Sequence, residues 1–218
     1  DFRMRYFNSD GGEAEMCGNG ARCIARFAYL KGVVNKKMTF ETIAGLVSAE
    51  ILENGVKIGV STPDNAELGL SLALDDGTSI LAHYIRAGVP HIIVYEDDVG
   101  KARVVELGRR IRYHKHFPRG TNVNFVQILN EGEAKIRTYE RGVEDETLAC
   151  GTGAVASAVL STLLGKTKPP ILLHAVGGDL TVDFLWQDGE LSFISDVSLA
   201  GDARIVMKGR MGEETWQW

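Results

Sequence analysis

The chain has 218 residues, of which 44% are hydrophobic and 24% charged, and its formal net charge at pH 7 is -5. This composition is typical of a soluble globular protein. The acidic balance, without a long Lys/Arg run, argues against a nucleic-acid partner, and the lack of an 18-residue apolar run argues against a membrane span. Three cysteines do not suit a secreted disulfide framework, so we expect a cytoplasmic protein.

The first residues already have the pattern of a strand, because β-forming residues alternate with charges over Phe2–Phe7. The sequence opens without an initiator Met, and we expect a further N-terminal segment to precede it. Asn8–Gly12 predicts a turn. The next segment predicts a helix over Gly18–Leu30, with Gly32 as its C-terminal stop.

The middle of the chain is rich in predicted strands. Met38–Val60 predicts a β-meander with turns at Ala44-Gly45 and Asn54-Gly55, the second being a typical hairpin signal. A boundary is expected at Thr62–Asn65. Ser71–Asp97 then predicts two or three further strands.

The last part of the chain predicts two more helices among strands. The helices are expected within Gly100–Phe117 and over Gly151–Leu164, and the strands at Val123–Leu129, Ala134–Glu140 and within Ile171–Met211. Many strands, three helices and no regular strand–helix–strand alternation indicate an α+β fold with mainly antiparallel pairing.

One segment of the sequence recurs. Cys17–Gly32 and Cys150–Gly165 share a Cys, two Gly and two Ala at matching places, and both end in Gly. We therefore expect two pseudosymmetric halves, each a curled sheet around its own central helix. The N-terminal half is assigned to residues 1–60, completed by 205–218, and the C-terminal half to residues 61–204.

The repeated cysteines have a chemical meaning at the start of a helix. Unpaired N–H groups and the positive end of the helix dipole lower a thiol pKa and can bind an anion such as a carboxylate. Two such halves place two thiols across one pocket. This arrangement suits inversion of a carbon stereocentre, in which one group removes the α-proton and the other delivers a proton to the opposite face.

Structural, metal-binding and phosphate-binding roles fit the repeated cysteines less well. A Cys17–Cys150 disulfide does not suit a reducing compartment, and the spacing from Cys17 to Cys23 is not that of a zinc site. The Cys-Gly-Asn-Gly-Ala segment lacks the Lys-Ser/Thr of a phosphate-binding loop. A structural role does fit Cys23, which lies inside its helix and is expected to be buried.

Two segments carry a family resemblance. Phe7–Cys23 (FNSDGGEAEMCGNGARC) and Tyr139–Ala154 (YERGVEDETLACGTGA) resemble the signatures of the diaminopimelate epimerases, a family of cofactor-independent amino-acid epimerases. The resemblance extends to Gly88–Val99 and Phe117–Ile128. Proline racemases also carry two cysteines, but they favour Cys-Gly-His and an Asp-Arg-Ser-Pro-Cys run. The resemblance implies two β-barrel halves, each around a helix, with the active site between them.

The resemblance also assigns roles to residues. It implies that Cys17 and Cys150 are the acid/base pair, supported by His91 and Glu140. It implies that the substrate is held by these residues: Asn8, Gly18, Asn19, Asn122, Glu140, Arg141, Gly151 and Thr152. Their chemistry fits a substrate with two ammonium and two carboxylate groups, since Glu suits an ammonium and Arg a carboxylate.

Three features depart from the family pattern. The family usually begins with a segment like KMHGLGNDF, which is absent here and strengthens the expectation of a missing N-terminal segment. The chain has Val89 where the family commonly has Asn, and the loop from Arg141 to Cys150 is one residue longer than its commonest form.

The implied reaction is epimerisation of LL-diaminopimelate to the meso form, a step of lysine biosynthesis, by a homodimer without pyridoxal phosphate or metal. Two alternatives stay open at this point. One is a racemase or epimerase of another amino acid, similar to a proline racemase, with Val89 reshaping the pocket. The other is an inactive amino-acid-binding protein.

Overall fold

The computed structural model describes residues 1–8, 11–187, 191–210 and 212. Within these ranges the fold is α+β, as predicted. The helices are α1 (Gly18–Leu30), α2 (Val104–Arg112) and α3 (Gly151–Leu163), with short 3-10 turns η1 (Val99–Lys101) and η2 (Leu191–Phe193). The strands are β1 (Phe2–Arg3), β2 (Tyr6–Phe7), β3 (Glu13–Ala14), β4 (Lys37–Thr42), β5 (Gly45–Leu52), β6 (Gly55–Gly59), β7 (Asp64–Ala73), β8 (Ser79–Ala87), β9 (Val89–Tyr95), β10 (Asn122–Asn130), β11 (Glu133–Glu140), β12 (Asp145–Thr147), β13 (Ile171–Ala175), β14 (Gly178–Leu185) and β15 (Ser195–Gly201).

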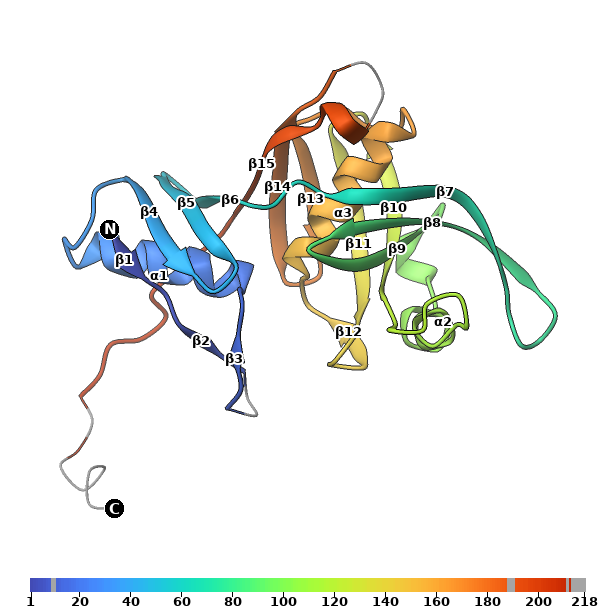
Figure 1. Cartoon of the computed structure of the whole chain (residues 1–218), viewed down its shortest axis with the longest axis horizontal. Coiled ribbons are helices and arrows are strands. Elements are labelled where there is room, and N and C mark those ends of the chain that lie inside the picture. Colours follow the sequence, from blue (N-terminus) through green and yellow to red (C-terminus); the bar gives the residue numbers. More distant parts are fainter. Residues whose placement is uncertain (9–10, 188–190, 211, 213–218) are drawn as a thin grey trace.

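One long sheet runs through the molecule (Figure 1). Its strand order is β1-β4-β5-β6-β15-β14-β13-β11-β10-β9-β8-β7, with β12 beside β11, and β2 and β3 form a separate hairpin. Pairing is mainly antiparallel, as predicted; β1/β4, β9/β10 and β11/β13 are parallel. Strand β15 pairs with β14 on one side and with β6 on the other, so it connects the N-terminal strands to the C-terminal strands.

Helix α3 lies inside the C-terminal part of the sheet. It packs against β8, β9, β10, β13 and β14, and all of its residues from Gly153 to Thr162 are buried. Its residues are apolar or small on every side, which is the pattern of a helix enclosed by a core. The predicted core position of this helix is thus confirmed.

Helix α1 is covered differently. It packs on β5 and β6 through a face that includes the buried Ala21, Ala25 and Ala28. Its other face carries Phe27 and Leu30, which are half exposed. Strands β4, β5 and β6 thus lie beside α1 (Figure 1), while its outer face remains open in the described structure.

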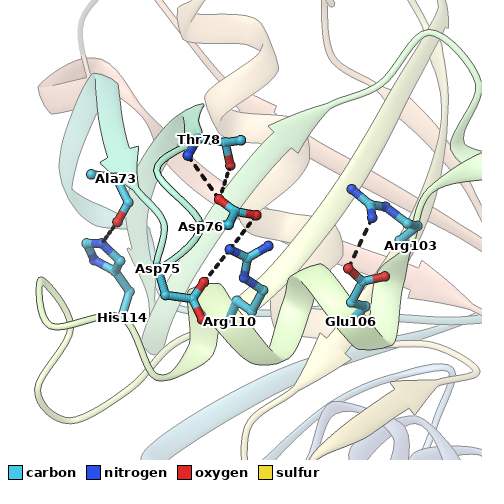
Figure 2. Close-up of polar contacts among 8 residues, drawn as sticks. All are labelled: Ala73, Asp75, Asp76, Thr78, Arg103, Glu106, Arg110 and His114. Atoms are coloured by element: carbon cyan, nitrogen blue, oxygen red, sulfur yellow. Dashed lines mark hydrogen bonds and ion pairs between the residues drawn. The ribbon is translucent and has the colours of Figure 1, made fainter.

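Helix α2 holds the turn between β7 and β8 (Figure 2). The Arg110 guanidinium pairs with the Asp75 carboxylate and lies 2.8 Å from Asp76 Oδ2. Asp76 also accepts hydrogen bonds from the Thr78 N–H (2.9 Å) and hydroxyl (2.6 Å). These bonds, those of Thr78 first, lower the pKa of Asp76 to about 2.

Two predicted elements have different bounds. The strand expected over Phe2–Phe7 is two strands, because β1 pairs with β4 while β2 pairs with β3. The helix expected within Gly100–Phe117 is shorter, because Ala102 is extended and separates η1 from α2, and Tyr113 leaves the helical conformation. Strand β12 was not predicted; it forms by antiparallel pairing with β11.

The C-terminal residues bear on the expected division of the chain. Strand β15 ends at Gly201, and residues 202–210 and 212 carry no helix or strand, although strands were expected up to Met211. Met211 and residues 213–218 lie outside the described residues. The division into residues 1–60 with 205–218 and residues 61–204 therefore stays a prediction. Of the helices in the described ranges, none is long and apolar enough to cross a bilayer.

Candidate active site

The N-terminus of α1 is built on Cys17. This residue is the N-cap, with extended backbone angles (φ -139°, ψ 117°), and its Sγ accepts a hydrogen bond from the Gly20 N–H at 3.4 Å. A Cβ at Gly20 would lie 3.0 Å from Met4 Cε and 3.3 Å from the Tyr6 ring. The glycine lets these side chains pack against the first turn beside the thiol.

The N-terminus of α3 repeats this geometry. Cys150 is the N-cap (φ -123°, ψ 111°), and its Sγ accepts from the Gly153 N–H at 3.4 Å. A Cβ at Gly153 would lie 2.4 Å from Asn124 Oδ1, so only glycine fits there without displacing the neighbouring strand β10. The two Cys-Gly-polar-Gly segments therefore form the same local structure.

The two helix N-termini face one cleft. This cleft, of about 1420 Å³, is lined by both cysteines and by residues of N-terminal and C-terminal strands. Leu199 of β15 lies between the two helix starts. Its Cδ2 would be 3.8 Å from a Cβ at Gly18 and 3.0 Å from a Cβ at Gly151. Figure 1 shows α1 and α3 on opposite sides of β15.

Most of the predicted site residues line this cleft. Together with both cysteines they are Asn8, Gly18, Asn19, Glu140, Gly151 and Thr152. Val89, the departure from the family pattern, lines it as well. His91, Asn122 and Arg141 are not among the lining residues.

The surroundings of Cys150 favour its protonated thiol. Burial, and then the negative charge of Glu140, raises the pKa of the Cys150 thiol to about 11. Hydrogen bonds from Thr152 and the Gly153 N–H act in the opposite direction but do not outweigh these causes. The expectation of a lowered thiol pKa at this helix N-terminus is therefore wrong for Cys150.

Tyr6 is a cleft residue that the sequence pattern did not reveal. Its ring packs on the first turn of α1 through Gly20, and its hydroxyl interacts with the Cys17 thiol. This hydrogen bond, with smaller effects that include Glu140, raises the pKa of Tyr6. Tyr6 belongs to the predicted first strand, and nothing local to the sequence indicated that the β2–β3 hairpin would direct it toward Cys17.

His91 is fully buried beneath α3. Burial, and then the charge of Arg141, lowers the pKa of His91 to about 3, so the imidazole is neutral. The Asn124 amide nitrogen donates to His91 Nδ1 at 3.1 Å, and Asn124 Oδ1 accepts from the Thr138 hydroxyl at 3.0 Å. His91 thus contacts Asn124, the residue that packs against Gly153, and through Asn124 it supports the N-terminus of α3.

Asn122 and Arg141 organise the end of β11. The Asn122 amide oxygen accepts a hydrogen bond from the Arg141 N–H at 2.7 Å, and Asn122 is buried. The Arg141 guanidinium donates to the Arg119 carbonyl at 3.2 Å. These bonds fix the backbone next to Glu140, which faces the cleft.

Cys23 is exposed, contrary to the expectation of a buried structural residue. It lies on the outer face of α1, which the described strands leave uncovered. All three cysteines are free thiols. In the described ranges, no group of three or more His, Cys, Asp or Glu side chains is placed to hold a metal ion.

Sequence comparison identifies the relatives of the chain. Residues 1–67 and 83–206 match the family model of diaminopimelate epimerase. The chain is 49% identical to the diaminopimelate epimerase of Aquifex aeolicus (strain VF5) over 222 residues, which cover 100% of this chain and 77% of the relative. It is 41% identical to the diaminopimelate epimerase of Hydrogenobaculum sp. (strain Y04AAS1), covering 98% and 76% respectively.

Structural comparison agrees on the fold. A probable proline racemase from Agrobacterium radiobacter K84, solved with bound carbonate, superposes with a TM-score of 0.69 at 16% identity, covering 94% of this chain and 72% of that one. A PhzF-family phenazine biosynthesis protein from Bacillus anthracis gives 0.67 at 16% identity, covering 92% and 77%. At this identity the similarity concerns the fold alone.

Proposed function

We propose that this chain, which belongs to the diaminopimelate epimerase family, interconverts LL- and meso-diaminopimelate by acid/base chemistry between Cys17 and Cys150. The observation that carries the proposal is the matched pair of N-cap thiols. Each starts a helix, each accepts a hydrogen bond at 3.4 Å, and both line the cleft on either side of Leu199.

The proposed reaction inverts the α-carbon in two proton transfers. One thiolate removes the α-proton, and the other thiol delivers its proton to the opposite face of the carbanion. Because the raised pKa keeps Cys150 protonated in the free protein, Cys17 is the base for the first transfer and Cys150 the acid. After one turnover the protonation states are exchanged, so the reverse reaction starts from Cys150.

The negative charge that develops on the substrate carboxylate needs donors. The first N–H groups of an α-helix have no intrahelical partner, and the helix dipole favours negative charge there. In the proposed complex, the N–H groups of Gly18, Asn19 and Gly151 hold this carboxylate as the carbanion forms. The Glu140 carboxylate suits a substrate ammonium, and Asn8 offers both a donor and an acceptor.

The proposals on cofactor use, pathway, compartment and oligomeric state follow from membership of the family. The two thiols carry the protons, and the reaction is proposed to proceed without pyridoxal phosphate or a metal ion. The product is proposed to enter lysine biosynthesis, in the cytoplasm, with the protein as a homodimer.

The test is α-hydrogen exchange in deuterated buffer, followed by proton NMR. The parent protein is expected to exchange and invert both LL- and meso-diaminopimelate. Cys17→Ala and Cys150→Ala each remove one base, so inversion is expected to fall by about 10²-fold or more. Cys150→Ala, which keeps the proposed base, should retain some exchange without inversion for one epimer only. Cys17→Ala should retain less, because the raised pKa of Cys150 leaves little of that thiol ionised. Cys23→Ala, on the exposed face of α1, is the matched control and should behave like the parent.

Three results would change the proposal. Equal activity of the parent and Cys150→Ala would contradict a two-thiol reaction. Exchange with another amino acid but not with diaminopimelate would favour the alternative epimerase. Val89, which lines the cleft, would then be the first residue to substitute in order to test what changes the substrate preference. Binding of diaminopimelate without exchange, both here and in a longer protein, would favour an amino-acid-binding protein.

A further inference from the structure

Arg22 is a buried cation in the second turn of α1. Its side chain is 6% exposed, and it forms no ion pair with a carboxylate among the described residues. One guanidinium N–H donates to Asn19 Oδ1 at 2.7 Å and another reaches the Gly18 carbonyl at 3.5 Å. Its Nε is buried without a hydrogen-bond partner, and a Cβ at Gly201 would lie 3.2 Å from it.

A buried Arg of this kind is unusual, because charged side chains are rarely buried without a pairing charge. Burial lowers the pKa of Arg22, and the negative charges of Cys23, Cys17 and Asp202 oppose that effect. The Asp202 carboxylate itself pairs with Arg204. The polar contacts of Arg22 are therefore directed to the first turn of α1, next to the Cys17 thiol.

The contact with Asn19 fixes the orientation of the Asn19 amide. A guanidinium has only donors, so the atom that faces Arg22 must be the amide oxygen. The NH₂ group of Asn19 is consequently turned away from Arg22, and Asn19 is exposed in the wall of the cleft. The α1 side of the cleft then presents donors: the first N–H groups of the helix and this amide.

The second helix has no group equivalent to Arg22. Counted from the cysteine, the position of Arg22 in α1 is that of Val155 in α3, which is buried and apolar.

We propose that Arg22 is a positioning residue that directs the Asn19 amide donor into the cleft. The role of this donor in carboxylate binding rests on the proposed function. The fixed orientation of the amide makes the α1 side of the cleft selective for a substrate carboxylate.

The first experiment needs no substrate. The side-chain NH₂ group of Asn19 is observed in a proton–nitrogen correlation NMR spectrum and is assigned by its loss in Asn19→Ala. In Arg22→Met both NH₂ resonances are expected to shift and to exchange faster with water, because the amide oxygen loses its hydrogen-bond donor. Arg22→Lys, which keeps a donor, should change them less. Arg26→Met, one turn further along α1, is the matched control and should leave these resonances unchanged.

The second experiment is a double-mutant cycle on KM for diaminopimelate. Arg22→Met alone is expected to raise KM by about tenfold with a smaller change in kcat, and by less than about twofold when Asn19 is already Ala. A purely structural role would raise KM similarly in both backgrounds. Asn19→Asp keeps an acceptor for Arg22 but removes the donor, so it should raise KM more than Asn19→Ala does.

The outcomes separate this proposal from the proposed function. Unchanged Asn19 NH₂ resonances in Arg22→Met, or equal effects of that change on KM in both Asn19 backgrounds, would overturn the role of Arg22. If Arg22→Met does not fold, Asn19→Asp decides: a KM at or below the parent value contradicts the assigned amide orientation. A parent that fails to epimerise but whose Asn19 NH₂ resonances shift on removal of Arg22 would refute the proposed reaction and leave the positioning role of Arg22 standing.

Discussion

The N-termini of α1 and α3 have the same backbone and opposite surroundings. Cys17 and Cys150 cap their helices with similar angles and the same sulfur–nitrogen distance. Around Cys17 stand a cation and a tyrosine hydroxyl, on a helix whose outer face is open. Around Cys150 stand a carboxylate and a closed core. The motif therefore sets the backbone position of each thiol, while the surroundings differ; for Cys150, burial and the charge of Glu140 from β11 raise the pKa.

The two helices differ most in burial, so leucine substitutions in them are expected to change the free energy of unfolding by very different amounts. Leu160 in α3 is fully buried, whereas Leu30 in α1 is 51% exposed. Leu160→Ala leaves a cavity and is expected to lower the free energy of unfolding by about 2–5 kcal/mol. Leu30→Ala should lower it by less than about 0.5 kcal/mol. Urea unfolding of the two variants measures both, and similar losses would contradict the open face of α1.

The second comparison uses the equivalent glycines of the two motifs. A Cβ at Gly153 would lie 2.4 Å from Asn124 Oδ1, whereas at Gly20 the nearest atom is the flexible tip of Met4 at 3.0 Å. Gly153→Ala is expected to lower the free energy of unfolding by about 1–3 kcal/mol and to displace Cys150. Gly20→Ala should stay within about 1 kcal/mol of the parent. Adding Asn124→Ala to Gly153→Ala should restore part of the loss, and a lack of any recovery would count against this clash.

The third prediction tests the charge around Cys150. Glu140→Gln removes the negative charge that helps to raise the pKa of this thiol, so the pKa is expected to fall while burial keeps part of the shift. A lower pKa means more thiolate at a fixed pH. Alkylation of Cys150 at about pH 8 should therefore be about 3- to 10-fold faster, with Cys23 as the internal reference. An unchanged or slower Cys150 rate would show that Glu140 does not act on this thiol.

The smallest expected effect concerns the pH dependence of the C-terminal sheet. His174 on β13 lies between Glu133 (2.6 Å) and Asp179 (2.8 Å), and these hydrogen bonds raise its pKa above 6.5. The group binds its proton more tightly when folded, so its contribution is fully present below pH 6.5 and is lost as the pH rises through the raised folded value. The urea midpoint of the parent should fall slightly more across that range than that of His174→Gln. Parallel pH curves would refute the prediction, and both partly exposed carboxylates keep the effect small.

Much of the helical structure was predictable because its signals are local. The Cys-Gly start and the Gly stop fall within one segment, so the bounds of α1 and α3 agree with the prediction to within one residue. The strand expected over Phe2–Phe7 was wrong as a single element, because β1 and β2 have partners far apart in the chain. Strand β12 was not predicted for the same reason, because it is defined by its pairing with β11 and not by a local sequence pattern.

The site was predictable in its composition and not in its electrostatics. Recurrence of the motif predicted that Cys17 and Cys150 would meet at one site, and both line the same cleft, while their catalytic roles stay a prediction. The raised pKa of Cys150 depends on burial by the surrounding sheet and on Glu140 at the end of β11, neither of which a helix N-terminus reveals. Arg22, by contrast, follows Asn19 by three positions in a helix, and this spacing could have indicated the contact.

Strand β15 makes the two parts of the molecule inseparable as modules. It contributes one edge to the ladder with β6 and the other to the ladder with β14, and its Leu199 touches both helix starts. A cut that divided the chain into two independent pieces would leave β6 or β15 with an unpaired edge, prone to association with other chains. Any rotation of one part against the other would have to deform the β6–β15 ladder, whose residues also line the cleft. The position of the two thiols relative to each other is therefore tied to the geometry of this single strand pair.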